Sequence, residues 1–169
     1  LHLLAGKPLL DHVLKTARKI SPASITLVVG YHADAVRKHL NGQNDIQIVV
    51  QEPQLGTGHA VLVCKEILAD FDGNIVVLGG DGPLLRADTI HDMVTLQETS
   101  GAAATLATSS IPDPTGYGRI VRDSHKRFAE IVEHKNATPR QLEIHEVYPS
   151  YAVFDATALW SCLDDLQPN

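Results

Sequence analysis

Apolar positions along the chain recur with two different spacings. After Pro8, a residue suited to the first turn of a helix, Leu9, Leu10, Val13 and Leu14 repeat at helical spacing. Short β-branched runs predict buried strands, at 25–30, 46–50, 75–78 and 102–108. Helical spacing between these runs predicts helices, at 33–40, 58–68 and 89–99. This alternation predicts parallel crossovers and therefore a mostly parallel, doubly wound α/β sheet.

The pattern changes after residue 110. Residues 119–122 and 128–133 predict a hairpin, and residues 147–154 predict one further strand. A closing helix is expected at 156–163. Because no repeat or linker divides the chain, we expect residues 1–169 to form one α/β domain with antiparallel additions.

Composition narrows the classes of partner. The chain has 169 residues and a formal net charge of −6, which does not suit a nucleic-acid or anionic-membrane surface. No apolar run approaches the roughly 20 residues of a membrane span. Cys64 and Cys162 each lie in apolar stretches, which favours two reduced thiols and a cytoplasmic location over a disulfide. We therefore expect a small-molecule partner, with neither nucleic acid nor membrane involved.

The first candidate motif lies between a predicted strand and a predicted helix, at residues 51–60. Gly56 and Gly58 would let backbone amides approach a ligand, and Thr57 could cap the helix. The amide side chains of Gln51 and Gln54 carry donors and acceptors that suit the edge of a pyrimidine. On spacing alone, a plain turn between strand and helix is the alternative.

The second motif is glycine-rich and follows the strand at 75–78. Gly79, Gly80, Asp81 and Gly82 occur in succession there. An acidic residue at the end of a strand is well placed to hold Mg²⁺ against a phosphate. The alternative is a turn in which Asp81 bonds to its own backbone.

Two further segments stand out, at 112–119 and 131–138. Taken singly, the first could be a rigid loop and the second an exposed sheet edge. The chain contains no zinc-binding HExxH pattern, no nucleophile elbow and no Walker-type phosphate loop. A metalloprotease, a hydrolase triad and a P-loop kinase are therefore unsupported.

Taken together and in order, these segments resemble a known family. Residues 54–60, 113–119 and 131–135 are similar to the uridylyltransferase half of the bacterial bifunctional enzymes that make UDP-N-acetylglucosamine, and the resemblance spans the whole chain. It implies a nucleotide-diphospho-sugar transferase fold. It also implies site residues: Gln51, Gly56 and Thr57 at the uracil; Gly79, Gly80 and Asp81 along the nucleotide; Gly118, Glu133 and the position of Tyr148 at the amino sugar.

The chemistry implied by the resemblance is a direct displacement. The phosphate oxygen of N-acetylglucosamine 1-phosphate would attack the α-phosphorus of UTP, and pyrophosphate would leave without an enzyme-bound intermediate. Such a reaction depends on positioning and charge neutralisation. Mg²⁺ is the implied cofactor, with Asp81 as a ligand. The family's full-length enzymes are implied to be homotrimers, assembled through an acyltransferase β-helix domain.

The chain departs from the family pattern at its ends and at one internal segment. The family's phosphate-binding loop and first strand precede the position of Leu1, and an Asn of the metal site and the β-helix domain follow the position of Asn169. We therefore expect a domain truncated at both ends, with little activity by itself. Tyr148, Pro149 and Ser150 stand where the family has Asn-Thr-Gly, and Gly79 where Tyr is common. A transferase for another sugar 1-phosphate and a non-catalytic nucleotide-binding remnant are the alternatives.

Overall fold

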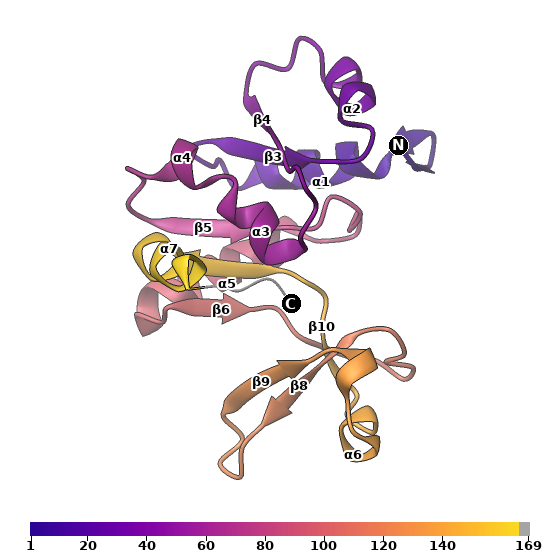
Figure 1. The fold of residues 1–169 in the computed structure, drawn as a ribbon, viewed down its shortest axis with the longest axis vertical. Coiled ribbons are helices and arrows are strands. Elements are labelled where there is room, and N and C mark those ends of the chain that lie inside the picture. Colours follow the sequence, from indigo (N-terminus) through magenta and orange to yellow (C-terminus); the bar gives the residue numbers. More distant parts are fainter. Residues whose placement is uncertain (166–169) are drawn as a thin grey trace.

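The computed structural model describes residues 1–165 and shows three layers of structure along its long axis (Figure 1). The first layer is a two-stranded parallel sheet with two helices against it. Its elements are, in chain order, β1 (Leu3–Leu4), β2 (Lys7–Pro8), α1 (Leu9–Lys19), β3 (Ile25–Val29), α2 (Ala33–His39) and β4 (Ile46–Val50). The apolar stripe of α1 buries Leu10, Val13 and Leu14, as its spacing predicts.

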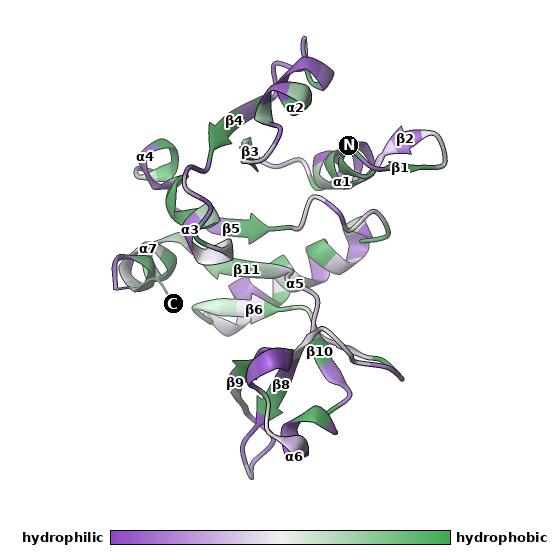
Figure 2. Cartoon of the chain, turned by 45° about the vertical axis from the view of Figure 1, so that its right-hand side comes forward, coloured by the Kyte–Doolittle hydropathy of each residue, from purple (hydrophilic) through white to green (hydrophobic). Residues whose placement is uncertain are grey.

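The second layer is a three-stranded sheet in the order β5-β11-β6. Its elements are α3 (Thr57–Leu62), α4 (Lys65–Leu68), β5 (Asn74–Val77), α5 (Ala87–Ser100), β6 (Ala104–Leu106), β11 (Ala152–Asp155) and α7 (Ala156–Asp164). Central β11 is antiparallel to both neighbours and pairs Ala152 with Val77 on one side and with Leu106 on the other. Hydrophobic residues gather in β5 (Figure 2), whose residues are half-buried.

The third layer is an antiparallel sheet in the order β7-β10-β8-β9. Its elements are β7 (Ser109–Ser110), β8 (Gly118–Arg122), β9 (Phe128–Val132), the 3₁₀ turn His134–Asn136, α6 (Pro139–Leu142) and β10 (Glu146–Tyr148). The predicted hairpin at 119–133 is confirmed as β8 and β9. The short helix α6 has a complete capping box between Thr138 and Gln141, a signature that sequence reasoning overlooked.

The strand predicted over 147–154 is wrong as a single element. Residues 146–148 form β10 in the third layer, and residues 152–155 form β11 in the second. Pro149 has no N–H for a sheet ladder, and Ser150 takes a left-handed backbone with φ 66°. The chain therefore leaves one sheet and enters the other at this point.

Two other expectations need correction. The helix predicted at 58–68 is interrupted, and α3 ends at Leu62 before α4 begins at Lys65. Within residues 1–165 only β3 and β4 pair in parallel, so the sequence overestimated parallel pairing. The cause is β11, which returns from the third layer and inserts antiparallel between β5 and β6.

A cavity of about 800 Å³ separates the first layer from the second. It is lined along one side by β3 and along the other by β5, and no backbone pairing joins these strands within the described part of the chain. Buried clusters lie on either side of it. Leu10, Leu14 and Leu40 form one cluster, and Ala156, Leu159, Trp160 and Leu163 form the other. Among residues 1–165, no helix is long and apolar enough to cross a membrane.

The ion pair between Arg122 and Glu146 in the third layer allows a test of stability at acid pH. Arg122 on β8 donates two hydrogen bonds to the Glu146 carboxylate on β10, at 2.6 and 2.8 Å. Arg122 thereby lowers the pKa of Glu146 below its usual range. Because the folded pKa is depressed, this pair stabilises the protein above the unfolded pKa of about 4.3, and the contribution disappears as the pH falls through the folded value.

We expect Glu146→Gln to lower the free energy of unfolding at pH 7 by about 0.5–1 kcal/mol, the range for a partly exposed pair. The free energies of unfolding of wild type and variant should converge by about pH 2, where Glu146 is protonated and therefore as neutral as the glutamine that replaces it. Urea unfolding at the two pH values measures the difference. A gap that persists unchanged at low pH would contradict the electrostatic origin.

Candidate active site

The carboxyl ends of β4 and β5 open toward the same cavity. Residues from three separate segments line it together: the motif at 51–60, the glycine-rich loop after β5, and the end of β10 with the connection that follows it. These residues are Gln51, Gln54, Thr57, Gly58, Gly79, Gly80, Tyr148 and Ser150. These residues are far apart in the sequence, and a plain turn would not require them to share one cavity. Ligands of open α/β sheets bind beyond the carboxyl ends of their strands, which is where these residues lie. We therefore treat this end of the cavity as the candidate active site.

The Gln51 side chain is held in one orientation. Its Nε2 donates to the Gly56 carbonyl oxygen at 2.9 Å and lies 3.1 Å from His59 Nδ1. Both amide hydrogens are thus engaged within the loop. The Oε1 atom takes part in no hydrogen bond among residues 1–165, so it remains an acceptor for a ligand.

The start of α3 differs from the sequence prediction. Thr57 was expected to cap the helix, but it is the first helical residue and its side chain forms no cap. Gly56 occupies the capping position with φ 102°, a backbone conformation that glycine adopts without strain. The loop at 51–57 therefore depends on Gly56 for its shape, and Thr57 is exposed at the mouth of the site.

Asp81 is exposed at the end of the β5 loop. It forms none of the ion pairs found within residues 1–165, and its Oδ1 turns back over Gly79, 3.0 Å from where a Cβ on that glycine would stand. The alternative in which Asp81 hydrogen-bonds its own backbone has no bond to support it. In the described part of the chain, no group of three or more His, Cys, Asp or Glu side chains is placed to hold a metal ion. Asp81 therefore belongs to no such group.

The three residues proposed for sugar contact are brought together by the third layer. Tyr148 on β10 is the register partner of Gly118 on β8. A Cβ on Gly118 would lie 3.6 Å from Glu133 Oε1, which places the Glu133 carboxylate beside this glycine. Burial raises the pKa of the Tyr148 hydroxyl, which therefore stays neutral. The Tyr148 phenol and the Glu133 carboxylate thus lie close to Gly118, which is buried, with Ile131 Cγ2 3.0 Å from where its Cβ would stand.

Sequence reasoning missed Arg119, although it follows Gly118 directly. Its side chain is 1% exposed, donates to the Tyr117 carbonyl oxygen and lies 3.3 Å from His134 Nδ1. Its Nε has no hydrogen-bond partner among the described residues. Arg119 thus connects the loop at 113–118 to the segment that follows β9, and both segments carry candidate residues. The motif contained Arg119, but only tertiary structure shows that it is buried.

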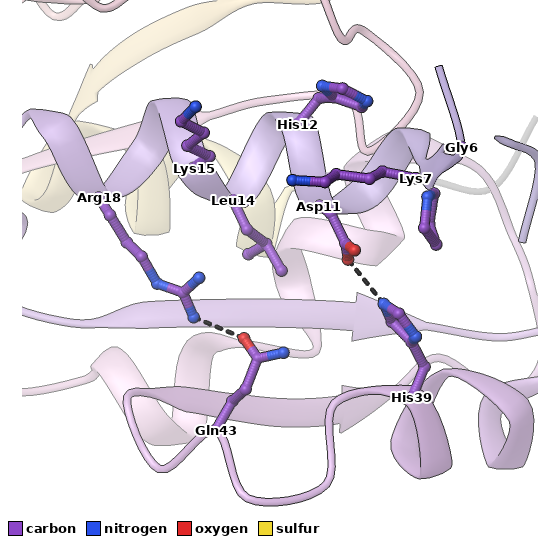
Figure 3. Close-up of a pocket in the computed structure, with 10 residues that line it drawn as sticks. Gly6, Lys7, Asp11, His12, Leu14, Lys15, Arg18, His39 and Gln43 are labelled. Carbon is purple, nitrogen blue, oxygen red and sulfur yellow. Dashed lines mark hydrogen bonds and ion pairs between the residues drawn. The ribbon is translucent and has the colours of Figure 1, made fainter. Parts of the chain in front are cut away.

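A second cavity, of about 640 Å³, lies between α1 and the segment 39–43, away from these residues. Figure 3 shows two contacts across it: His39 Nε2 lies 2.6 Å from Asp11, and Arg18 bonds Gln43 at 2.7 Å, while Lys7 and Lys15 line it without an ion pair among the described residues. Arg18 also reaches Asp45 at 2.6 Å. These contacts join α1 to the segment after α2, so a structural role accounts for them.

Comparisons with known proteins identify the family of this chain. A family model described as "Nucleotidyl transferase" matches residues 1–152. The chain belongs to the nucleotidyl transferase family. Its curated relatives include proteins named "Bifunctional protein GlmU": one from Pelobacter propionicus is 40% identical over 166 residues, and one from Levilactobacillus brevis is 44% identical over 165. The chain spans 36% of the length of each, and each alignment covers 98% of this chain.

The fold of this nucleotidyl transferase also matches a solved structure. A Bacillus anthracis protein assigned as a glucose-1-phosphate thymidylyltransferase, solved in complex with sucrose, superposes with a TM-score of 0.77. The alignment covers 99% of this chain and 66% of that protein, at 17% identity. This likeness shows the fold, and the expected nucleotide-diphospho-sugar transferase architecture is confirmed.

Proposed function

We propose that this chain carries the uridylyl-transfer site of a protein that joins UTP to N-acetylglucosamine 1-phosphate, releasing UDP-N-acetylglucosamine and pyrophosphate. The observation that carries the proposal is the shared cavity, which is lined by Gln51 and Thr57 from the predicted base site, Gly79 and Gly80 from the nucleotide site and Tyr148 from the sugar site. The other predicted residues, Gly56, Asp81, Gly118 and Glu133, are outside this lining. The names of the GlmU relatives and the nucleotidyl transferase match support the same chemistry.

Base selection would come from the loop at 51–59. The free Gln51 Oε1 can accept the N3–H of uracil, while cytosine presents an acceptor at that position. Gly56 has no side chain, and open space lies where its Cβ would stand, so the backbone can approach the ring closely. These contacts orient the nucleoside and thereby aim its phosphates at the loop after β5.

Asp81 fits a magnesium ligand. Mg²⁺ takes one or two protein carboxylates and completes its shell with water and phosphate oxygens, and Asp81 is one exposed, unpaired carboxylate beside two glycines. When bound there, Mg²⁺ would neutralise charge on the phosphates during the displacement. Gly79 and Gly80 leave room for the phosphate chain, and Gly118 and Glu133 would hold the attacking sugar phosphate in line.

Uridine binding tests the proposal directly. In an NMR titration of the ¹⁵N-labelled chain, we expect shifts at residues 51–59 that are larger for uridine than for cytidine at equal concentration. Gln51→Leu removes the free acceptor and should reduce the preference by about tenfold, the effect of an unpaired buried polar group. Gln47→Leu, on β4 and outside the cavity lining, is the matched control. Equal responses to both nucleosides would contradict base recognition.

A second candidate function is transfer to a different sugar 1-phosphate. Tyr148 motivates it, because a phenol stands where the resemblance places an asparagine. A phenol offers one donor and a flat apolar face, whereas an amide offers two donors and an acceptor for an acetamido group. Comparing the binding of UDP-N-acetylglucosamine with that of UDP-glucose separates the candidates. Tighter binding of UDP-glucose would favour the second.

A further inference from the structure

Tyr151 lies at the edge of the candidate site, although no motif includes it. It precedes β11, whose first residue, Ala152, pairs with Val77 at the end of β5. Because β11 is antiparallel to β5, its amino end lies beside the carboxyl end of β5. The Tyr151 carbonyl accepts a hydrogen bond from the Ala107 N–H at 3.0 Å, which fixes the backbone there.

The Tyr151 side chain reaches the loop that holds Asp81. A Cβ on Gly82 would lie 1.7 Å from the Tyr151 hydroxyl oxygen and 2.8 Å from the ring carbon that bears it. No side chain other than hydrogen fits at Gly82 while the ring stays in place. The phenol and the glycine therefore form a fitted contact one residue beyond the proposed magnesium ligand.

The surroundings of this hydroxyl point to a ligand. Burial raises the pKa of Tyr151, and the negative charge of Asp81 raises it further. The hydroxyl lies against the loop that carries Asp81. None of the hydrogen bonds found within residues 1–165 uses this hydroxyl, which is only partly exposed. A neutral donor with no hydrogen-bond partner among the described residues therefore stands beside the proposed phosphate position.

We propose that the Tyr151 hydroxyl contacts the substrate and donates a hydrogen bond to the phosphate that links nucleoside and sugar. The inference rests on the proposed function and adds a residue to it. A phosphate is the favoured acceptor because its oxygens are anionic and would lie next to the metal at Asp81, whereas a cation offers this donor no acceptor. Tyr151 therefore contributes to affinity for the diphosphate-linked sugar and contributes nothing to recognition of the base.

The test uses two probes, uridine and UDP-N-acetylglucosamine with Mg²⁺, and follows NMR shifts of the full chain. Tyr151→Phe keeps the ring and removes the hydroxyl, and we expect it to weaken binding of the nucleotide sugar by about tenfold, the effect of losing a hydrogen bond to a charged group. Uridine binding should be unchanged. Tyr31→Phe, whose side chain is 81% exposed, is the matched control and should change neither.

Gly82→Ala provides a second variant, because its methyl group must displace the phenol. This variant should weaken binding of the nucleotide sugar as Tyr151→Phe does, and it should leave binding of uridine unchanged. Equal affinity of wild type and both variants for UDP-N-acetylglucosamine would overturn the inference. A fall in uridine affinity of the same size would also overturn it, since a general structural role would then account for the loss. Failure of the proposed function is distinguishable, because wild type itself would then show no preference for uridine over cytidine.

Discussion

Replacing Asp81 with Asn will remove the metal dependence of nucleotide-sugar binding. The change keeps the shape of the side chain and deletes the one exposed carboxylate at the end of the β5 loop. A neutral amide oxygen is a far weaker ligand for Mg²⁺, which prefers carboxylates. We expect the gain in affinity for UDP-N-acetylglucosamine on adding Mg²⁺ to fall by on the order of 10²-fold, several kcal/mol being the usual contribution of a bound metal.

Paramagnetic broadening by Mn²⁺ gives an independent measurement. In wild type with the nucleotide sugar, amide signals of residues 79–82 should broaden first, and in Asp81→Asn they should not. Asp92→Asn, an exposed carboxylate on α5, is the control and should behave as wild type. Broadening that survives in Asp81→Asn would show that the metal binds elsewhere.

Arg119→Ala will cause the largest loss of stability among the site residues. It empties the space of a fully buried side chain and leaves the Tyr117 carbonyl without its donor. Cavity formation and an unsatisfied polar group together cost about 2–4 kcal/mol. Because Arg119 connects the Gly118 loop to His134, the face proposed to contact the sugar should lose its geometry with it.

Urea unfolding at pH 7 measures this difference. The free energy of unfolding of Arg119→Lys should lie between those of wild type and the alanine variant. Lysine keeps the positive charge and the aliphatic part of the side chain but cannot reach two acceptors in one plane. Arg127→Ala, on the same hairpin with a side chain 74% exposed, should cost under about 1 kcal/mol. Similar losses for Arg119→Ala and Arg127→Ala would refute the positioning role of Arg119.

Local pattern predicted the elements whose residues interact mainly within the element or with the next one. The strand at 46–50 is confirmed at both ends, and the helix α1 buries the stripe that its spacing indicates. Motif order predicted which segments would meet, since Gln51, Gly79 and Tyr148 share a cavity. Their roles toward ligand stay predictions.

What local pattern could not show depends on distant partners. The apolar run at 147–154 has strand character throughout, and only the geometry around Pro149 and Ser150 assigns its halves to two sheets. The buried state of Arg119 and the fit of Tyr151 against Gly82 arise from contacts between separate segments. Composition and spacing carry no signal for such contacts, because each residue alone is typical of an exposed loop or strand end.

The cavity between β3 and β5 separates two sheets that differ in size and in how they are covered. The unit that contains β11 has a three-stranded sheet whose central residues Ala152 and Val153 are 0% exposed. The unit that contains β3 and β4 has a two-stranded sheet, which depends for its stability on the apolar side chains of α1 and α2 packed on it. The loop proposed to recognise the base follows β4, and the loop proposed to hold the phosphates follows β5, so the proposed function would divide base selection and phosphate binding between two separate sheets.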